Sequence, residues 1–246
     1  MIHQTWHEGL PCCDRTWEDA YARFETPEEE IAKFTRRFRR LGVPAWPRHA
    51  AIVDLFCGRG NALVALERMG FTNLTGVDLS PHLLEQYRGP ARLILGDCRD
   101  LRFAPGSIDY FTVQGGLHHL PRIPEDLEQC LAAIHRCLKP EGRLLIVEPW
   151  QTPFLRLVHA ISENPVARRF SGKIAALHTM IRAERDTYTR WLDSSRIILE
   201  RVKTLFHPHI ELFTLGKWMA VYSKQARQET SHTTSFLHEH SPPVAV

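Results

Sequence analysis

The chain has 246 residues, of which 43% are hydrophobic and 24% are charged, and its formal net charge is +3. This composition fits a globular protein with one α/β domain and a modest addition. The apolar runs are too short to span a bilayer, and the mildly basic charge falls short of a nucleic-acid footprint. The first residues show no apolar signal-peptide segment, so we expect a cytoplasmic protein whose six cysteines are reduced. Their spacing contains no C-x-x-C pair, and no metal site is expected.

Residues 1–47 are expected to form an N-terminal helical cap. A helix start is indicated by Thr26 as the cap, Pro27 in the first turn and acidic residues after it. Apolar residues then recur at helical spacing, and Gly42 is a natural end for the helix. Four arginines crowd its last turns, and their simplest interpretation is a solvated helix end: Arg36, Arg37, Arg39 and Arg40.

Strand and helix patterns alternate between about residues 50 and 150, which predicts a parallel sheet with helices on both faces. The expected strands are 51–56, 74–78, 91–95, 108–114 and 142–148, and the expected helices are 62–70, 81–87 and 124–138. Two further strands, 209–214 and 217–222, form a hairpin around Gly216. We therefore expect a Rossmann-like, mostly parallel seven-stranded α/β sheet with an antiparallel C-terminal hairpin strand.

The domain boundaries follow from these patterns. The main domain is expected to cover residues 48–224 and to carry a helical insertion at about 151–190, which covers the substrate. Residues 225–246 are polar and lack apolar periodicity, so a disordered tail is expected.

The chemistry is concentrated where the predicted strands end. Asp54 ends the first strand and is followed by a turn that contains Gly58 and Gly60. Asp78 ends the next strand, where an acid can accept both ribose hydroxyls of a nucleoside. Asp97 ends the third strand, where it can accept a hydrogen bond from an adenine amino group. These ends meet at one edge of a parallel sheet, so a nucleoside site is expected there.

The acids also indicate which nucleoside is bound. A dinucleotide site typically has a third glycine, but Leu63 stands at that position. Acidic side chains near a pyrophosphate repel it, whereas they suit an adenosine that carries a cationic amino-acid arm. The residues therefore favour an adenosine with a cationic amino-acid arm over NAD, which remains an alternative.

These motifs resemble the core of class I S-adenosylmethionine-dependent methyltransferases, of the methyltransferase type 11 group that includes C-methyltransferases of ubiquinone and menaquinone synthesis. They occur in the order of that family and extend over some two-fifths of the chain. The matching segments are Val53–Gly60 (VDLFCGRG), Gly76–Ser80 (GVDLS), Gly96–Cys98 (GDC), Ile108–Tyr110 (IDY), Gly116–Leu120 (GLHHL) and Leu138–Leu144 (LKPEGRL).

The resemblance implies a role for each matching position. The methionine part of the cofactor would contact Asp54, Gly58 and Gly60. Asp78 would hold the ribose, and Leu79 would pack on the adenine. The other implied contacts are Asp97 and Cys98 at the adenine edge, and Gln114 and Gly115 beside the donor sulfonium. Arg59 stands where the family often has a small residue, so its side chain is expected to point away from that sulfonium.

Methyl transfer from a sulfonium mainly requires that the acceptor be held in line with the methyl group. A base is needed only if the acceptor loses a proton. His118 and His119 are the catalytic candidates, and His119 is the working hypothesis because it follows the donor-facing strand end.

The acceptor is expected to be a small molecule covered by Trp17, Tyr21 and Phe24 and by residues 151–190. An acidic or phosphorylated acceptor is indicated by the basic excess in that segment, and a lipid-like one by its first apolar helix. Neither a nucleic-acid partner nor stable membrane insertion is expected, and the oligomeric state is left open. The basic residues are Arg156, Arg168, Arg169, Lys173, Arg182, Arg185 and Arg190.

Two rival functions remain besides methyl transfer. A NAD-dependent oxidoreductase would use the same strand ends, although Leu63 counts against it. A non-catalytic S-adenosylmethionine-binding protein would keep the cofactor motifs without transferring a methyl group. Methylation of nucleic-acid amino groups is disfavoured because residues 113–116 read Val-Gln-Gly-Gly, without the Pro-Pro-aromatic run of such enzymes.

Overall fold

A computed structural model describes residues 1–6 and 15–225 of the chain. The expected disordered tail therefore lies outside the described residues, apart from Gln225. Eight strands form one sheet in the order β1-β4-β3-β2-β5-β6-β8-β7. Seven of them had been expected. The eighth is β1 (Gln4–Thr5), a two-residue strand that pairs in parallel with β4 and forms one edge of the sheet.

The centre of the sheet is parallel, as predicted, and its far edge is an antiparallel hairpin. The parallel strands are β2 (Ile52–Leu55), β3 (Leu74–Asp78), β4 (Arg92–Leu95), β5 (Ile108–Gln114) and β6 (Leu138–Pro149). The hairpin strands are β7 (Phe206–Thr214) and β8 (Lys217–Lys224). Leu215 and Gly216, between them, both have positive φ, as a tight two-residue hairpin turn requires.

Each face of the sheet buries its own hydrophobic core. On one face, α5 (Glu125–Cys137) and α10 (Ser195–Leu205) pack with Phe111 and Trp218. On the other, α2 (Pro27–Arg40) and α3 (Asn61–Arg68) pack with Leu145 and Val221. The Thr26 side chain accepts a hydrogen bond from Glu29 N–H, and the Glu29 side chain accepts one from Thr26 N–H, so the predicted start of α2 is confirmed.

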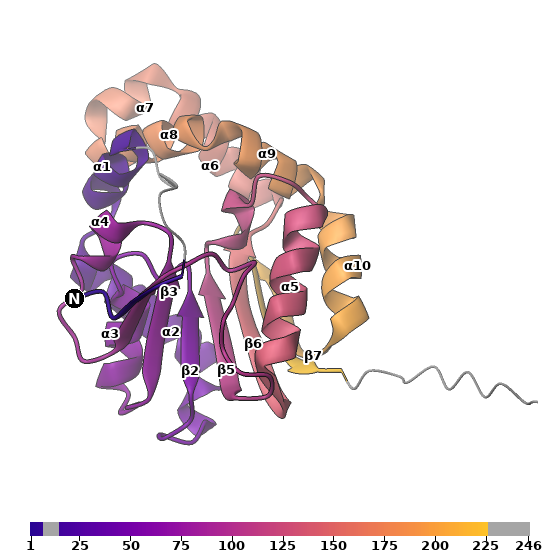
Figure 1. Cartoon of the computed structure of the whole chain (residues 1–246). Helices are drawn as coiled ribbons and strands as arrows, with labels where there is room; N and C mark the ends of the chain where they lie inside the picture. Colours follow the sequence, from indigo (N-terminus) through magenta and orange to yellow (C-terminus); the bar gives the residue numbers. More distant parts are fainter. Residues whose placement is uncertain (7–14, 226–246) are drawn as a thin grey trace, which may run out of the picture.

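The remaining helices gather over the edge where the parallel strands end. In Figure 1, α1 (Arg15–Phe24) and the helices α6 (Pro153–Glu163) to α9 (Arg185–Asp193) arch over this edge. Between them in sequence lie α7 (Pro165–Phe170) and α8 (Gly172–Ala183), and α1 packs against α8. The short α4 (Pro81–Leu84) follows β3 and ends earlier than the expected helix at 81–87. No helix among the described residues is long and apolar enough to cross a membrane.

The indole of Trp191 attaches α9 to the sheet. Its side chain is fully buried, and its Nε1–H donates a hydrogen bond of 2.9 Å to the carbonyl oxygen of Pro149, at the end of β6. This contact attaches the C-terminal half of α9, the helix that follows Glu184, to the end of β6. The segment that covers the edge is thus held by a buried hydrogen bond as well as by apolar packing.

Candidate functional site

A cavity of roughly 720 Å³ lies between the carboxyl edge of the sheet and the helices above it. Strands β3 and β5 lie on either side of β2, so the order of strands reverses at this point, where ligands bind in open α/β sheets. Of the site residues predicted from the sequence, all but Gly60 line this cavity: Asp54, Gly58, Asp78, Leu79, Asp97, Cys98, Gln114, Gly115, His118 and His119.

Gly60 does not line the cavity, but it lies in the turn between β2 and α3. Its φ of +79° and that of Gly58, +52°, lie in the left-handed region, where side chains cause strain. A Cβ added at Gly60 would lie 2.4 Å from the ring of Tyr87. The chain can therefore turn sharply from β2 into α3 only with glycine at this position.

Asp54 and Asp78 lie on adjacent strands below this turn. Oδ1 of Asp54 accepts a hydrogen bond of 2.5 Å from the hydroxyl of Thr112 on β5. Burial raises the pKa of Asp54 to about 7, against the lowering effect of Thr112, and Asp78 adds to the increase. Asp78 accepts backbone hydrogen bonds of 2.7 Å from Gly58 and 2.8 Å from Ser80. Both carboxylates are thus held rigidly at the cavity floor.

Asp97 is already bound by a cation. Its carboxylate accepts hydrogen bonds from the Arg99 guanidinium, the shortest of them 2.6 Å long, and Arg99 also contacts Asp126 at 3.0 Å. A nucleobase amino group at Asp97 would have to share the carboxylate with Arg99. The family resemblance did not indicate this ion pair, because the matching segment ends at Cys98, one residue before Arg99.

Gln114 presents an unsatisfied amide to the cavity at the end of β5. Its Oε1 and Nε2 are both buried, and neither forms a hydrogen bond with any described residue. A buried amide without a partner costs about 1–3 kcal/mol, so a polar ligand here would recover that energy. Gly115 follows with a φ of +80° and turns the chain toward the histidines.

His118 and His119 follow in a short 3-10 turn (Leu117–His119), and a buried carboxylate organises this turn. Oε1 of Glu148 accepts the backbone N–H groups of Gly116 and Leu117, each at 2.8 Å. Oε2 of Glu148 lies 2.7 Å from Nδ1 of His118. Burial alone would lower the pKa of His118, but the hydrogen bond and charge of Glu148 raise it above the usual value.

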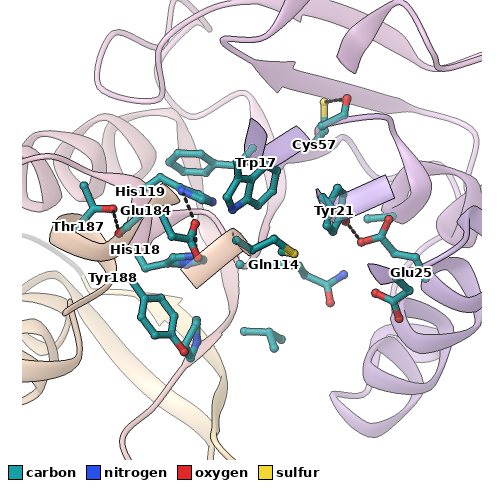
Figure 2. A pocket seen from close by; sticks show the side chains of 18 of the residues that line it. Trp17, Tyr21, Glu25, Cys57, Gln114, His118, His119, Glu184, Thr187 and Tyr188 are labelled. Atoms are coloured by element: carbon teal, nitrogen blue, oxygen red, sulfur yellow. Dashed lines mark hydrogen bonds and ion pairs between the residues drawn. The ribbon is translucent and has the colours of Figure 1, made fainter. Parts of the chain in front are cut away.

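Glu184, between α8 and α9 of the covering segment, completes this part of the site, as Figure 2 shows. Oε2 of Glu184 lies 3.3 Å from Nδ1 of His119 and 3.8 Å from Nε2 of His118. Burial, followed by the charge of His118, lowers the pKa of His119 well below its usual value. The indole of Trp17, from α1, meets the His119 ring edge-on. Neither Glu148 nor Glu184 belongs to a motif that sequence analysis could single out.

Arg59 is directed toward α2 rather than left free in the cavity. Its Nη2 lies 3.1 Å from Oε2 of Glu30 and 2.8 Å from the carbonyl oxygen of Glu25, and its guanidinium covers the ring of Tyr21. Asn61 donates a further hydrogen bond of 2.7 Å to Glu30. A buried carboxylate therefore neutralises the arginine of the glycine turn.

The cations of the cavity are not those expected from the sequence. None of the seven basic residues of the 151–190 segment lines the cavity. Instead Lys33 and Arg37 of α2 and Lys217 of β8 do so. Lys33 is paired with Glu25, whereas Arg37 and Lys217 form no ion pair within the part of the chain that the structure describes. Burial, together with the charge of Arg37, lowers the pKa of Lys217 to about 8.

Arg37 had been interpreted as part of a solvated helix end, and the structure shows otherwise. It lies three residues after Phe34 and seven after Glu30, on the same face of α2 as these two buried side chains. This spacing is the signal that could have separated it from Arg36, Arg39 and Arg40, which do not line the cavity.

The sequence is similar to that of known methyltransferases. The family described as a methyltransferase domain matches residues 53–146. The ubiquinone/menaquinone biosynthesis C-methyltransferase UbiE of Rubrivivax gelatinosus is 36% identical over 131 residues. The aligned region covers 50% of this chain and 49% of that protein, so the chain spans about half the length of this curated relative.

Solved structures share the fold over a longer stretch. The PH0226 protein of Pyrococcus horikoshii superimposes with a TM-score of 0.65 at 18% identity, over 87% of this chain and 100% of that one. Geranyl diphosphate C-methyltransferase of Streptomyces coelicolor, solved with Mg²⁺, geranyl diphosphate and S-adenosyl-L-homocysteine, gives 0.54 at 16% identity and covers 88% and 86% of the two chains. At these identities the likeness concerns the fold alone.

Proposed function

Because this chain contains a methyltransferase domain of the class I, S-adenosylmethionine-dependent family, we propose that it transfers a methyl group from S-adenosylmethionine to a small, anionic and partly apolar acceptor. The cofactor supplies a methyl group made electrophilic by its positively charged sulfur. The protein has to hold the two reactants in line, which can supply about 7–11 kcal/mol of the barrier.

The cavity floor fits this cofactor. Ionised Asp54 would attract its amino group across the glycine turn, and Asp78 would accept the ribose hydroxyls with the lone pairs that Gly58 and Ser80 leave free. The unsatisfied amide of Gln114 would give a polar partner to the methionine part beside Gly115. These contacts keep the roles expected from the family resemblance.

The adenine side fits with one modification. Leu79 and Cys98 line the cavity next to Asp97. Because Arg99 already occupies part of the Asp97 carboxylate, the adenine amino group would bind an oxygen that also accepts from Arg99. Asp97 also accepts the backbone N–H of Arg99 at 2.8 Å, so the adenine amino group would compete with Arg99 for this carboxylate.

The acceptor would bind above the cofactor, between two cations and an apolar wall. Arg37 and Lys217 leave positive charge without an ion-pair partner among the described residues. Phe154, Leu155 and Val158 of α6 add apolar surface, as does Met180 of α8. A buried cation strongly favours an anionic partner, so a carboxylate or phosphate group attached to an apolar body is the class that fits. The covering segment at 151–190 acts in this proposal as the substrate cap.

His118 and His119 are proposed to face the reacting end of the acceptor. They follow the strand end that carries Gln114 and Gly115, on the side of the cavity covered by Glu184. If the acceptor has to lose a proton, His119 is the base candidate. Otherwise the pair contributes to positioning only.

The observation that carries the proposal is the arrangement of carboxylates at three successive strand ends around one cavity that also contains the unsatisfied Gln114 amide. Calorimetric titration should give saturable binding of S-adenosylmethionine and none of NAD. Asp78→Ala should weaken this binding about 5–150-fold, the effect of losing two hydrogen bonds of about 0.5–1.5 kcal/mol each.

Asp100→Ala provides a matched control. Asp100 follows the third carboxylate strand end but lies at the surface, paired with Arg102, and does not line the cavity. Its replacement should leave the affinity unchanged. Binding of NAD instead, or wild-type affinity in Asp78→Ala, would refute the cofactor assignment. Transfer of labelled methyl to a panel of amphipathic carboxylates and phosphates then separates an enzyme from a non-catalytic binder.

A further inference from the structure

Three side chains from two distant segments converge on one point of the cavity wall. His118, His119 and Glu184 each offer one donor atom, and these atoms all lie within 4.8 Å of one another. The carboxylate of Glu184 is 3.3 Å from Nδ1 of His119 and 3.8 Å from Nε2 of His118. Figure 2 shows the three side chains pointing toward one another between α9 and the turn after β5.

The spacing matches what a transition-metal ion requires. Zinc binds nitrogen at about 2.0–2.1 Å and carboxylate oxygen at about 2.0–2.2 Å, so neighbouring ligand atoms of a tetrahedral site lie roughly 3.4 Å apart. Both distances from Glu184 are close to this value. The two rings lie beside each other with centroids 4.2 Å apart, so the donor atoms of both histidines and of Glu184 face one region of the cavity wall.

Glu148 adds an independent feature of metal sites. Histidine ligands of metals almost always donate their other ring N–H to a carboxylate or carbonyl, which fixes the tautomer. Glu148 accepts from Nδ1 of His118 at 2.7 Å, and its second oxygen is held by Gly116 and Leu117 N–H. The lone pair of His118 is therefore left on Nε2, the atom that lies beside Glu184.

Glu184 is also left with an unsatisfied oxygen. Its Oε2 is buried and accepts no hydrogen bond from the residues that the structure describes. Glu148 is fully buried close by, so two carboxylates are concentrated around two imidazoles. The charged groups that face them from other elements are Lys217 of β8 and Arg37 of α2. A divalent ion bound beside Glu184 would balance the charge of the two carboxylates.

We propose that His118, His119 and Glu184 bind one divalent transition-metal ion of the zinc type, with Glu148 as the carboxylate that orients His118. Two imidazoles and one carboxylate form a ligand set that suits such ions. Three protein ligands leave at least one coordination position open, and all three residues line the cavity. The open position would therefore accept an oxygen atom of a bound molecule.

The role of the ion rests on the proposed function, whereas its binding does not. In a methyltransferase, an oxygen of the acceptor would occupy the open position, adding a third positive group beside Arg37 and Lys217. Coordination through Nδ1 would prevent His119 from accepting a proton on that atom. The metal site and the His119 base are thus alternative roles for one residue.

No metal site was expected from the sequence, because the cysteines form no C-x-x-C pair and their spacing does not match a zinc site. Glu184 follows His119 by 65 positions, and it reaches the histidines only because Trp191 docks α9 onto β6.

Metal binding can be measured without any methyl acceptor. After treatment with a chelator, the full chain is titrated with Co²⁺ and followed by the visible d–d absorption, and Zn²⁺ is then added to displace it. We expect one equivalent to bind, without the thiolate charge-transfer band that cysteine ligands would produce. Glu184→Gln and His119→Ala should each weaken binding by at least tenfold, and Glu148→Gln by about 10–100-fold, as for other carboxylates that orient a ligand.

His159→Ala is the matched control, because His159 also lines the cavity but lies outside the cluster and contacts Tyr188. It should bind Co²⁺ as the wild type does. Circular dichroism establishes that each variant is folded, and Glu184→Gln, which keeps the size of the side chain, guards against a misfolded His119→Ala. Absence of saturable binding, or equal affinity in Glu184→Gln and wild type, would overturn the proposal. Calorimetry with S-adenosylmethionine on the same samples tests the proposed function separately.

Discussion

Arg59 and Glu30 form a buried ion pair that joins the glycine turn after β2 to helix α2. Nη2 of Arg59 lies 3.1 Å from Oε2 of Glu30, and their side chains are only 8% and 2% exposed. The same carboxylate accepts hydrogen bonds from Asn61 and from the hydroxyl of Tyr21 in α1. One buried acid thus connects the floor of the cavity to two helices that line its wall.

Removing this carboxylate should therefore destabilise the fold. Glu30→Ala leaves the guanidinium of Arg59 buried without its partner, and breaking such a pair typically costs about 3–5 kcal/mol. Urea unfolding followed by circular dichroism measures the change in free energy of unfolding. Glu28→Ala, on the same helix, removes an ion pair to Arg68 that is exposed to solvent. It should leave the unfolding curve unchanged, and equal effects of the two variants would contradict the structural role of Glu30.

The affinity for S-adenosylmethionine should increase with pH up to about 7. Burial raises the pKa of Asp54 to about 7, so the carboxyl is protonated in the free protein at pH 5–6. The cationic amino group of the cofactor favours the ionised form, which lowers the pKa in the complex, and binding therefore releases a proton. Affinity should rise by up to about tenfold per pH unit between pH 5 and 7.

Asp54→Asn removes this titration. Its affinity should be lower than that of the wild type at pH 7 and nearly constant between pH 5 and 7. Calorimetry in buffers of different ionisation enthalpy counts the released protons directly. A wild-type affinity that does not change over this range would show that Asp54 does not meet the amino group.

The parts of the fold that could be predicted are those set by local patterns. β5 has the predicted bounds, Ile108–Gln114, because its apolar run is closed by a glycine turn. β1 was missed because a two-residue strand has no periodicity of its own and is defined only by its hydrogen bonds to β4. The helix at 81–87 was predicted too long, since α4 ends at Leu84 and the chain then leads Tyr87 under the glycine turn.

The residues of the site likewise fall into those that local sequence patterns predict and those that only tertiary packing brings together. Of the site residues predicted from the motifs, all but Gly60 line the cavity at the carboxyl edge, because parallel strands that end in a glycine or an acid end at one edge. Glu184 and Lys217 could not be singled out, since only the packing of α9 and of the hairpin brings them to the cavity. Glu148 lies next to the last residue of β6 but belongs to no motif. The basic residues of the 151–190 segment were misleading. The sequence shows how many there are, but it does not show that their side chains lie outside the cavity.

Arg37 and Lys217 should control the affinity for an anionic acceptor rather than for the cofactor. Replacing either residue with Met keeps much of its apolar stem and removes the charge, and loss of a charged hydrogen bond costs about 1.5–3 kcal/mol, or roughly 10–150-fold in KM. The affinity for S-adenosylmethionine should change little. Arg36→Met provides a control one residue away, because Arg36 does not line the cavity.

The pH dependence distinguishes the two cations. A lysine with a pKa of about 8 is charged below that pH and neutral above it. The KM for an anionic acceptor should therefore rise as pH increases through about 8 in the wild type. Lys217→Met should have a high KM that is insensitive to pH in this range. If both proteins show the same rise, another group is responsible.

Gly60 and Gly106 allow backbone strain to be separated from steric overlap. Both have positive φ, +79° and +64°, so alanine at either position costs about 1–2 kcal/mol in a left-handed conformation. Nothing lies within 4 Å of a Cβ at Gly106, whereas a Cβ at Gly60 would overlap the ring of Tyr87 at 2.4 Å. The ring cannot move easily, because its hydroxyl accepts the backbone N–H of Ala91 and donates to Glu67.

Gly60→Ala should consequently lose about 1–3 kcal/mol more in free energy of unfolding than Gly106→Ala, the usual cost of overpacking. Urea unfolding of the two variants measures the difference. Tyr87→Leu in the Gly60→Ala background should recover part of it, because the overlap with the ring is relieved while the strain remains. If both glycine variants lose the same stability, or if Tyr87→Leu recovers nothing, strain alone explains why the turn between β2 and α3 needs glycine.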